Sequence, residues 1–341
     1  MQSVKAVNIT SNGISTKRRK RHMNKNVDSA KKVDVSKILG KYGVYIALLV
    51  LFVVMSFASS SFLTVTNLFN ILKQNAVYGV LAVGMTFVIV TGGIDLSVGA
   101  IVALAACFAT KLAQDGAGVP VIVAILVGLI TGVACGAFSG LFIAIANIPA
   151  FIATLATCTI ARGIVFVFTD GRPITGVSDA YKYMGRASWG PVPVMVVIYL
   201  LFLVVGTFLL KYTKYGRHVF AIGGNKRAAL VSGVNVKMTE FLVYVISGFC
   251  AAFAGLLLSS RIQTGQPAGG EGYELDAITA AVIGGASLSG GKGSVFGSFI
   301  GILVVGILTN GLDLLNVSSY YQQIIKGAII LLAVMADRKK D

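Results

Sequence analysis

The chain has 341 residues, of which 56% are apolar and only 12% are charged. Soluble globular domains carry about 25% charged residues, so this composition excludes that class and predicts a protein that needs a lipid bilayer. The net charge of +16, from 29 Lys and Arg against 13 Asp and Glu, would by itself also fit a nucleic-acid-binding protein. The position of these charges along the chain argues against that function.

A basic arm begins the chain. Residues 1–43 hold eleven Lys and Arg, including the run Lys17–Arg21, and the first apolar run begins only near Val44. A basic segment ahead of an apolar span typically determines its orientation in the membrane. We therefore expect residues 1–42 to form a disordered cytoplasmic arm, with nucleic-acid or lipid-head-group binding as the less favoured alternative. Because no cleavable signal peptide is evident, we expect the first apolar run to remain as a span.

Ten apolar runs follow, each of approximately the length that crosses a bilayer. They cover residues 43–60, 76–93, 97–114, 119–146, 150–169, 191–211, 240–260, 274–289, 294–312 and 319–336. The third, eighth and tenth are short or polar enough to be broken or re-entrant helices. We therefore predict an all-α polytopic membrane protein with about ten transmembrane helices, in a single transmembrane domain over residues 43–337.

The distribution of basic residues agrees with ten crossings from a cytoplasmic N-terminus. In that arrangement 21 of the 29 Lys and Arg lie in cytoplasmic segments, mainly the arm and the loop 211–239. Lys and Arg near span ends resist translocation, so they accumulate on the cytoplasmic side. We expect both termini, including the tail 338–341, to be cytoplasmic, and the protein to lie in a bacterial inner membrane.

Two glycine-rich segments interrupt the apolar runs. Sliding the chain by 192 residues aligns Gly92, Gly93, Leu96, Ser97 and Gly99 with Gly284, Gly285, Leu288, Ser289 and Gly291. Two internal repeats would explain this match, and chance similarity of glycine-rich segments is the alternative. Six crossings between the copies would make them parallel, whereas one re-entrant segment would make them inverted.

These interruptions also carry polar residues. Asp95 in the first segment aligns with Ser287 in the second, and both residue types are good N-caps for a helix that restarts. The functional alternative, compatible with capping, is that broken helices line a pathway and offer backbone or carboxylate groups to a polyol. The pathway candidates are Asn70, Gln74, Gly92, Gly93, Asp95, Ser97, Gly284, Gly285, Ser287 and Ser289.

Charges inside the apolar runs need partners. Arg162 lies in the middle of the fifth run, where a charge costs roughly 2.5–3.5 kcal/mol on insertion scales. Asp95, Glu274 and Asp276 are the acids within reach, and we favour an ion pair between spans over a substrate contact. Lys326 can extend toward an interface, and we assign it no role.

No motif in the chain predicts an enzyme. The four Cys lie in apolar runs and the two His have no acidic or Cys neighbour at ligand spacing, so we expect no metal site. Residues 290–294 (GGKGS) do not match a phosphate-binding loop, because Gly293 rather than Ser or Thr follows Lys292. We also find no nucleophile–base set and expect no cofactor.

The loop 213–239 contains a predicted helix. Asn225 is a suitable N-cap, residues 226–232 are mostly helix formers, and Gly233 is a suitable terminating residue. Small Ala228 and Ala229 beside basic side chains would let this helix fit a groove on a partner protein. An ordinary amphipathic loop is the alternative.

Long segments of the chain identify a family resemblance. The matching segments are Asn67–Asn70, Ala82–Gly99, Ala150–Leu155, Ala221–Val236, Gly272–Gly293 and Val317–Val334. From about residue 40 to residue 338 the chain resembles the permeases of bacterial ribose-type sugar importers of the ATP-binding-cassette class. The arm before Met23 is not part of this pattern.

The resemblance implies a permease that works as a pair, which we expect to be a homodimer, together with a cassette ATPase and an extracytoplasmic sugar-binding protein. ATP would be bound by the ATPase and not by this chain. Ribose is the nearest match, and xylose and galactose permeases share most motifs. The resemblance also assigns the coupling to the ATPase to one segment. Its residues are Gly223, Gly224, Asn225, Lys226, Arg227, Ala228, Ala229, Ser232 and Gly233.

A self-sufficient secondary transporter is the main alternative. It would couple Asp95, Arg162 and Asp276 to a proton or sodium gradient. A channel or scaffold without an ATPase partner is a further alternative.

Overall fold

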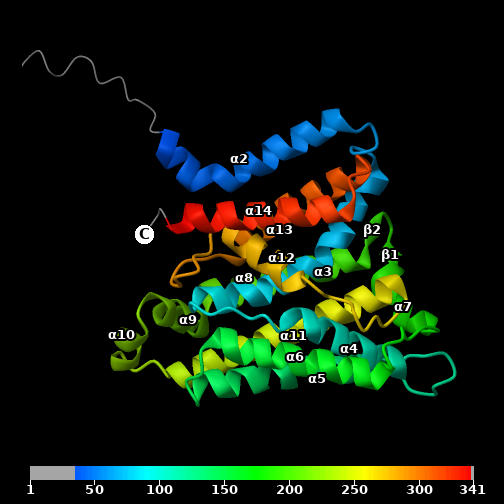
Figure 1. The fold of residues 1–341 in the computed structure, drawn as a ribbon, viewed down its shortest axis with the longest axis horizontal. Coiled ribbons are helices and arrows are strands. Elements are labelled where there is room, and N and C mark those ends of the chain that lie inside the picture. The colour runs from blue at the N-terminus through cyan, green and yellow to red at the C-terminus, as the bar shows by residue number, and fades with distance from the viewer. Residues whose placement is uncertain (1–34, 339–341) are drawn as a thin grey trace, which may run out of the picture. The chain divides into compact units, whose positions relative to one another are not determined.

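The computed structural model describes residues 35–338 of the chain, and these are almost entirely helical (Figure 1). The chain divides into two units at Gly43, and the site and packing described below belong to the second unit, which starts at Val44. Residues 1–34 and 339–341, which hold most of the predicted basic arm and of the C-terminal tail, lie outside the described residues. The first helix begins at Val35, within the segment predicted as the arm.

Helices of very different length follow one another, with a single two-stranded hairpin between them. In chain order the elements are α2 (Val35–Ala58), α3 (Val65–Val90), α4 (Val98–Leu112), α5 (Val121–Ala144), α6 (Ala150–Thr169), α7 (Asp179–Arg186), β1 (Ser188–Trp189), β2 (Val192–Pro193), α8 (Val194–Tyr212), α9 (Lys214–Gly224), α10 (Lys226–Val231), α11 (Val236–Ile262), α12 (Tyr273–Ile283), α13 (Val295–Leu314) and α14 (Ser319–Arg338). The strands pair antiparallel, with Trp189 opposite Val192.

Each of the ten predicted apolar runs coincides with a helix, but not every helix has the length of a span. Within the described residues, six helices are long and apolar enough to cross a membrane, namely α3, α5, α6, α8, α11 and α13. At a rise of 1.5 Å per residue, the 11 residues of α12 cover only about 16 Å, or half of a bilayer core. The fold is therefore an all-α multi-pass membrane protein, and the count of about ten spans stays a prediction.

Helix α3 forms the centre of the bundle. Its most apolar 18-residue stretch is 83% buried, against 22% for α5 and 28% for α6. It packs against α8, α11, α12 and α13, which surround it in Figure 1. Because most residues of these stretches in α5 and α6 are not buried, the two helices form the outer layer on their side of the bundle.

A row of glycines brings α5 and α11 together. Gly128, Gly132, Gly136 and Gly140 recur every fourth residue and so lie on one face of α5. A Cβ on Gly132 would overlap the carbonyl oxygen of Gly248, and one on Gly136 would overlap that of Tyr244. Such spacing lets two helix backbones approach closely inside a membrane, where packing rather than apolar burial drives association.

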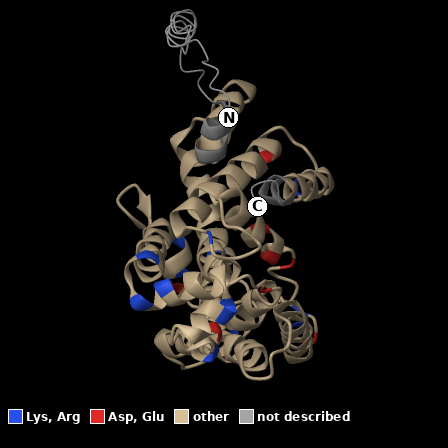
Figure 2. Cartoon of the chain, turned by 90° about the vertical axis from the view of Figure 1, so that its left-hand side faces the viewer, with Lys and Arg blue, Asp and Glu red and all other residues tan. Residues whose placement is uncertain are grey.

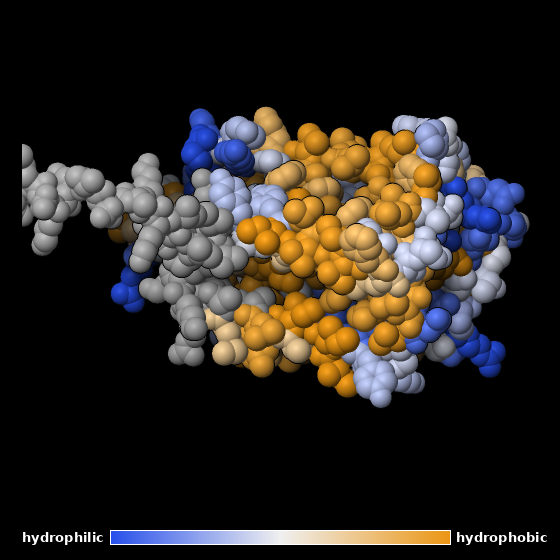
Figure 3. All heavy atoms as spheres, turned by 90° about the horizontal axis from the view of Figure 1, so that it is seen from above, coloured by the Kyte–Doolittle hydropathy of each residue, from blue (hydrophilic) through white to orange (hydrophobic). Residues whose placement is uncertain are grey.

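The surface has the distribution expected for a lipid-facing protein. Large apolar side chains are strongly exposed in the middle of spans, including Ile130 at 64% and Val204 at 65%, and Val167 near the end of α6 is 82% exposed. Figure 3 shows apolar side chains over the middle of the face that it views and hydrophilic ones toward the ends. Exposed apolar surface of this extent would promote aggregation in water but is favourable against lipid.

Candidate functional site

The two predicted helix interruptions meet at one end of the bundle. Helix α3 ends at Val90 and α12 ends at Ile283, and residues 91–97 and 284–294 are not helical. The Gly291 N–H donates a hydrogen bond of 2.9 Å to the Val90 carbonyl oxygen, which joins the two interruptions directly. Both helices therefore run toward the same end, called here the α10 end because α9 and α10 lie there (Figure 1). This arrangement agrees with parallel rather than inverted copies.

Asp95 and Ser287 do not cap the restarted helices, contrary to the sequence prediction. The N-cap of α4 is Ser97, and that of α13 is Ser294, which accepts a hydrogen bond from the Gly297 N–H. Asp95 lies two residues before the N-cap of α4, and its Oδ1 accepts from the Ser97 N–H at 2.9 Å. The Ser287 hydroxyl accepts from the N–H of Ser289 in the same way, at 3.4 Å. Both residues thus stabilise the turn before the helix rather than its first turn.

Asp95 is completely buried and joins two elements. Its Oδ1 also accepts a hydrogen bond of 2.6 Å from the Ser97 hydroxyl, and its Oδ2 accepts one of 2.7 Å from the Ser247 hydroxyl on α11. Three donors therefore satisfy this carboxylate, which fixes the first interruption against α11. A buried carboxylate with these partners is a structural anchor and has no free oxygen directed to a ligand.

Two short helices make up the segment that the resemblance assigned to coupling. The Thr213 hydroxyl caps α9 by accepting from the Gly216 N–H, and the Asn225 side chain caps α10 by accepting from the Ala228 N–H at 2.9 Å. After α10, Ser232 is the C-cap and Gly233 has a φ of 83°, which ends the helix in the left-handed region. The short helix and its two boundaries match the prediction, whereas α9 was not predicted.

The side chains of α10 divide into an inner and an outer set. Ala229 is buried and packs with Ile222 and Val236, which seats the helix on its neighbours. Leu230 and Val231 are 63% and 89% exposed, so α10 presents apolar side chains to solvent beside its basic ones. The remaining residues of the predicted coupling set are exposed on or beside α10, namely Gly224, Asn225, Lys226, Arg227, Ala228, Ser232 and Gly233.

Gly223, at the end of α9, lies against both interruptions. A Cβ on Gly223 would overlap the Val90 carbonyl oxygen and would also collide with the backbone nitrogen of Gly291. On the other side, a Cβ on Gly290 would lie 2.8 Å from the Gly223 carbonyl oxygen and 3.0 Å from the Gly92 nitrogen. We call Val90, Gly92, Gly223, Gly290 and Gly291 the glycine junction. Backbone touches backbone there, so a displacement of α9 must be followed by both interruptions.

A polar cavity of about 230 Å³ opens beside the glycine junction. It is lined by Thr91, Gly92, Gly93, Ile143, Asn147, Ile148, Pro149, Ala150, Lys226, Glu240 and Tyr244. Lys226 of α10 forms an ion pair with Glu240 of α11, with 2.7 Å between Nζ and Oε1. The first interruption and the coupling segment therefore share one cavity at the α10 end.

A second polar cavity, of about 490 Å³, lies at the opposite end, called here the α7 end. Asn70, Lys73, Gln74, Gly185, Arg186 and Arg261 line it. The structure thus brings the pathway candidates Asn70 and Gln74 together, but about the length of α3 away from the candidates in the two interruptions. Among its lining residues are three cations and no acid, which sequence reasoning did not find because they come from α3, α7 and α11.

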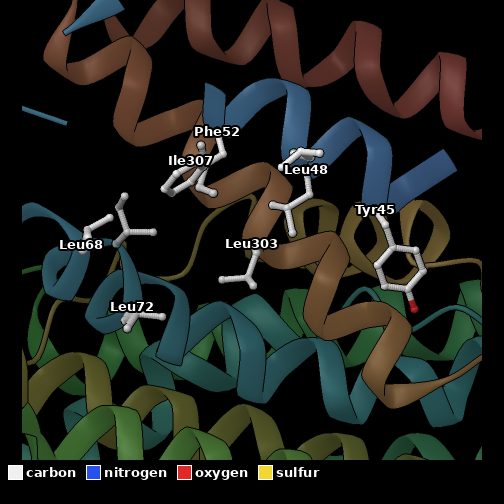
Figure 4. Close-up of a pocket in the computed structure, with 9 residues that line it drawn as sticks. Tyr45, Leu48, Phe52, Leu68, Leu72, Leu303 and Ile307 are labelled. Atoms are coloured by element: carbon white, nitrogen blue, oxygen red, sulfur yellow. The ribbon is translucent and has the colours of Figure 1, made fainter. Parts of the chain in front are cut away.

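A third cavity, in the described part of the chain, is apolar. Its volume is about 650 Å³, and Tyr45, Leu48 and Phe52 of α2, Leu68 and Leu72 of α3, and Leu303 and Ile307 of α13 line it, with Leu49 and Ile71 (Figure 4). A polyol needs hydrogen-bond partners, which this lining does not supply. The groove is therefore not a candidate site for a sugar.

Arg162 does not form the predicted ion pair with an acid, because backbone carbonyl oxygens are its partners. Its Nη1 donates hydrogen bonds to the carbonyl oxygens of Pro267 and Gly269, at 2.8 and 2.9 Å, and it forms no ion pair with any described acid. These carbonyls belong to the non-helical segment before α12, where no helical N–H reaches them. The guanidinium thus satisfies backbone groups that would otherwise be unpaired inside the bundle.

We expect Arg162→Leu to lower the stability of the protein by about 3 kcal/mol, because each hydrogen bond to a charged group contributes about 1.5–3 kcal/mol and two are lost. Thermal unfolding in detergent measures this effect. Arg162→Lys can retain one of the two bonds, so it should fall between wild type and Arg162→Leu. Equal melting temperatures for wild type and Arg162→Leu would contradict this role.

The two acids at the start of α12 have different surroundings. Asp276 forms an ion pair with Lys326 of α14, with 3.1 Å between Oδ1 and Nζ, which gives Lys326 a partner that the sequence did not reveal. Glu274 lies against Gly99 near the start of α4, where a Cβ on the glycine would overlap its Oε2. Across residues 35–338, no group of three or more His, Cys, Asp or Glu is placed to hold a metal ion.

Comparison with known proteins identifies the family. A family model described as the permease component of a branched-chain amino acid transport system matches residues 67–334. The chain belongs to this permease family. It is 46% identical to the ribose import permease protein RbsC of Bacillus subtilis, over 91% of this chain and 96% of that protein. It is 44% identical to RbsC of Escherichia coli K12, over 86% and 92% of the two chains.

A xylose transport system permease protein, XylH of Haemophilus influenzae, is 35% identical over 86% of this permease and 96% of its own length. No solved structure matches the permease. Membership of the family agrees with the prediction of a transport subunit rather than an enzyme.

Proposed function

We propose that this permease is the membrane-spanning subunit of an ATP-binding-cassette importer that carries a monosaccharide, with ribose as the favoured substrate. The names of the relatives support a sugar, because two ribose permeases at 44–46% identity precede the xylose permease at 35%. The importer would include a cassette ATPase, an extracytoplasmic sugar-binding protein and a second copy of the permease. It would lie in a bacterial inner membrane.

The α9–α10 segment with its glycine junction is the observation that carries this proposal. A permease without a phosphate-binding loop needs a contact through which an external ATPase can drive it. Helix α10 offers exposed Leu230 and Val231, while Gly223 connects the same segment to both interruptions. Closure of the ATPase pair would push α10, and the junction would pass the displacement to α3 and α12.

The charge distribution supports a cytoplasmic α10 end. Residues 211–239 hold six Lys and Arg and no Asp or Glu, and Figure 2, which looks onto the α10 end, shows Lys and Arg on its helices and loops. Under the positive-inside rule this end would face the cytoplasm, and a cytoplasmic location of both termini is part of the same proposal. The cavity at the α7 end would then face the binding protein and be the entrance of the pathway.

The secondary transporter receives no support from the geometry. Asp95 is satisfied by serine donors, Arg162 by two carbonyls and Asp276 by Lys326. Each of the three charges thus has its own separate partners. An ion-coupling site would need at least two of them to share one ion or proton.

We expect the double substitution Leu230→Glu and Val231→Glu to abolish association with the ATPase, because it places two carboxylates on the apolar surface of α10. Affinity purification of the tagged permease from its native membranes, followed by assay of ATP hydrolysis in the eluate, measures the association. Hydrolysis should fall at least 10-fold relative to wild type. Trp189→Glu is the matched control, since Trp189 is 59% exposed at the α7 end.

Retention of the ATPase by the double variant would contradict the assignment of α10 as the docking helix. Loss of the ATPase in Trp189→Glu as well would indicate a general effect of exposed acids, and would contradict it equally.

A further inference from the structure

A cluster of polar side chains lies within the bundle, between α3, α12, α13 and α14. It consists of Gln74, Asn75 and Tyr78 of α3, Asp276 of α12, Thr309 of α13 and Lys326 of α14. These side chains surround a cavity of about 10 Å³, which has room for approximately one water molecule. Ionisable and amide side chains are expensive inside a membrane protein, so a cluster contributed by four helices calls for a function.

The amide of Asn75 is incompletely satisfied. Asn75 is 1% exposed, and its Nδ2 has no hydrogen-bond partner. The side chain lies against Gly306 of α13, where a Cβ would overlap its amide atoms. Leaving such a donor unpaired costs about 1–3 kcal/mol, which is unexpected for a purely structural residue in a packed bundle.

The cluster and the cavity at the α7 end share one lining residue, Gln74. Asn70, Gln74 and Tyr78 are spaced four residues apart, so they follow one face of α3. Asn70 lines the cavity at the α7 end, Tyr78 lines the cluster, and Gln74 lines both. A solute that enters from the α7 end therefore meets the cluster next.

Helix α14 covers the cluster and is the least embedded helix around it. Its packing within the bundle is mainly on α12, and its ion pair from Lys326 to Asp276 lies at the edge of the cavity. Tyr320 and Tyr321 at its start are 80% and 65% exposed. A displacement of α14 would enlarge the cavity while disturbing few other contacts.

We propose that this cluster is a transient binding site for the hydroxyl groups of a neutral monosaccharide passing through the permease. This inference rests on the proposed function. Amide, carboxylate, ammonium and hydroxyl groups supply the donors and acceptors that a polyol needs, and the Tyr78 ring supplies an apolar surface for its C–H groups. The unpaired Asn75 Nδ2 gains its partner when the sugar is present.

The test uses the permease reconstituted in proteoliposomes with its ATPase and its binding protein, with ribose as the probe. Thr309→Val removes one hydroxyl at constant volume, and Gln74→Leu removes the amide shared with the entrance. We expect ribose uptake per ATP hydrolysed to fall about 2- to 10-fold in Thr309→Val, as for the loss of one hydrogen bond, and at least 10-fold in Gln74→Leu. Thr159→Val, at an exposed position of α6, should leave the ratio unchanged.

Uptake per ATP hydrolysed is the decisive readout, because a structural defect would lower uptake and hydrolysis together. An unchanged ratio in both Thr309→Val and Gln74→Leu would overturn the site, as would a loss that parallels a lower melting temperature. Failure of the proposed function is distinguishable, since wild type itself would then show no ATP-dependent ribose uptake.

Discussion

Gly223→Ala is expected to lower ATP-driven uptake at least 10-fold, while the protein still inserts into the membrane and binds its ATPase. The new Cβ would overlap the Val90 carbonyl oxygen and collide with the Gly291 nitrogen, both of which are backbone atoms. Backbone cannot rotate away as a flexible side chain does, so α9 must separate from the two interruptions. Separation would leave α10 free to bind the ATPase but unable to move α3 and α12. Uptake in proteoliposomes, with ATP hydrolysis measured in parallel, tests this.

Gly224→Ala is a closely matched control for that experiment. The position of a Cβ on Gly224 has no atom within 4 Å, although the residue is adjacent to Gly223 and in the same helix. Its uptake should remain near that of wild type. Equal uptake in Gly223→Ala and wild type would show that the junction does not transmit motion. Equal losses of uptake in Gly223→Ala and Gly224→Ala would show that the effect comes from replacing any glycine of this helix and not from the contact of Gly223 with Val90 and Gly291.

Asp95→Ala is expected to lower the stability of the protein strongly. Its carboxylate accepts from the Ser97 N–H, the Ser97 hydroxyl and the Ser247 hydroxyl, and all of these groups are buried. Each donor left without a partner costs about 1–3 kcal/mol, so the loss should be about 3 kcal/mol or more. In thermal unfolding this corresponds to a decrease in melting temperature on the order of 10 °C.

Asp95→Asn separates hydrogen bonding from charge. Its Oδ1 can still accept from Ser97, and its Nδ2 can donate to the Ser247 hydroxyl, so most of the stability should return. If the melting temperature of Asp95→Ala lay within about 2 °C of the wild-type value, the anchor role of this carboxylate would be contradicted.

The helices that pack against lipid or form the core were predictable from sequence. Their apolar runs are long, and Gly, Pro and charged residues mark their ends, so each of the ten predicted runs coincides with a helix. Helix α9 was not predicted because Gly216, Gly223 and Gly224 lie within 11 residues and lower its helix propensity. Its tertiary contacts outweigh that cost.

The interior of the site was less predictable, for reasons that particular residues illustrate. Arg162 was expected to pair with an acid, but its partners are backbone carbonyls, which every residue carries and which leave no signal in the sequence. The junction depends on contact between Val90, Gly223 and Gly291, whose separation along the chain gives no hint of proximity. Likewise the sequence does not indicate that Asn75 and Thr309 line one cavity, because this depends on the packing of α3 against α13.

Uptake of labelled ribose by proteoliposomes tests the central claim most directly, namely that this permease is moved by an external ATPase through α9 and α10. We expect uptake only when the permease, the ATPase, the binding protein and internal ATP are all present, and loss of uptake when Gly223→Ala replaces wild type. Uptake by the permease alone, driven by a proton or sodium gradient without ATP, would contradict the account.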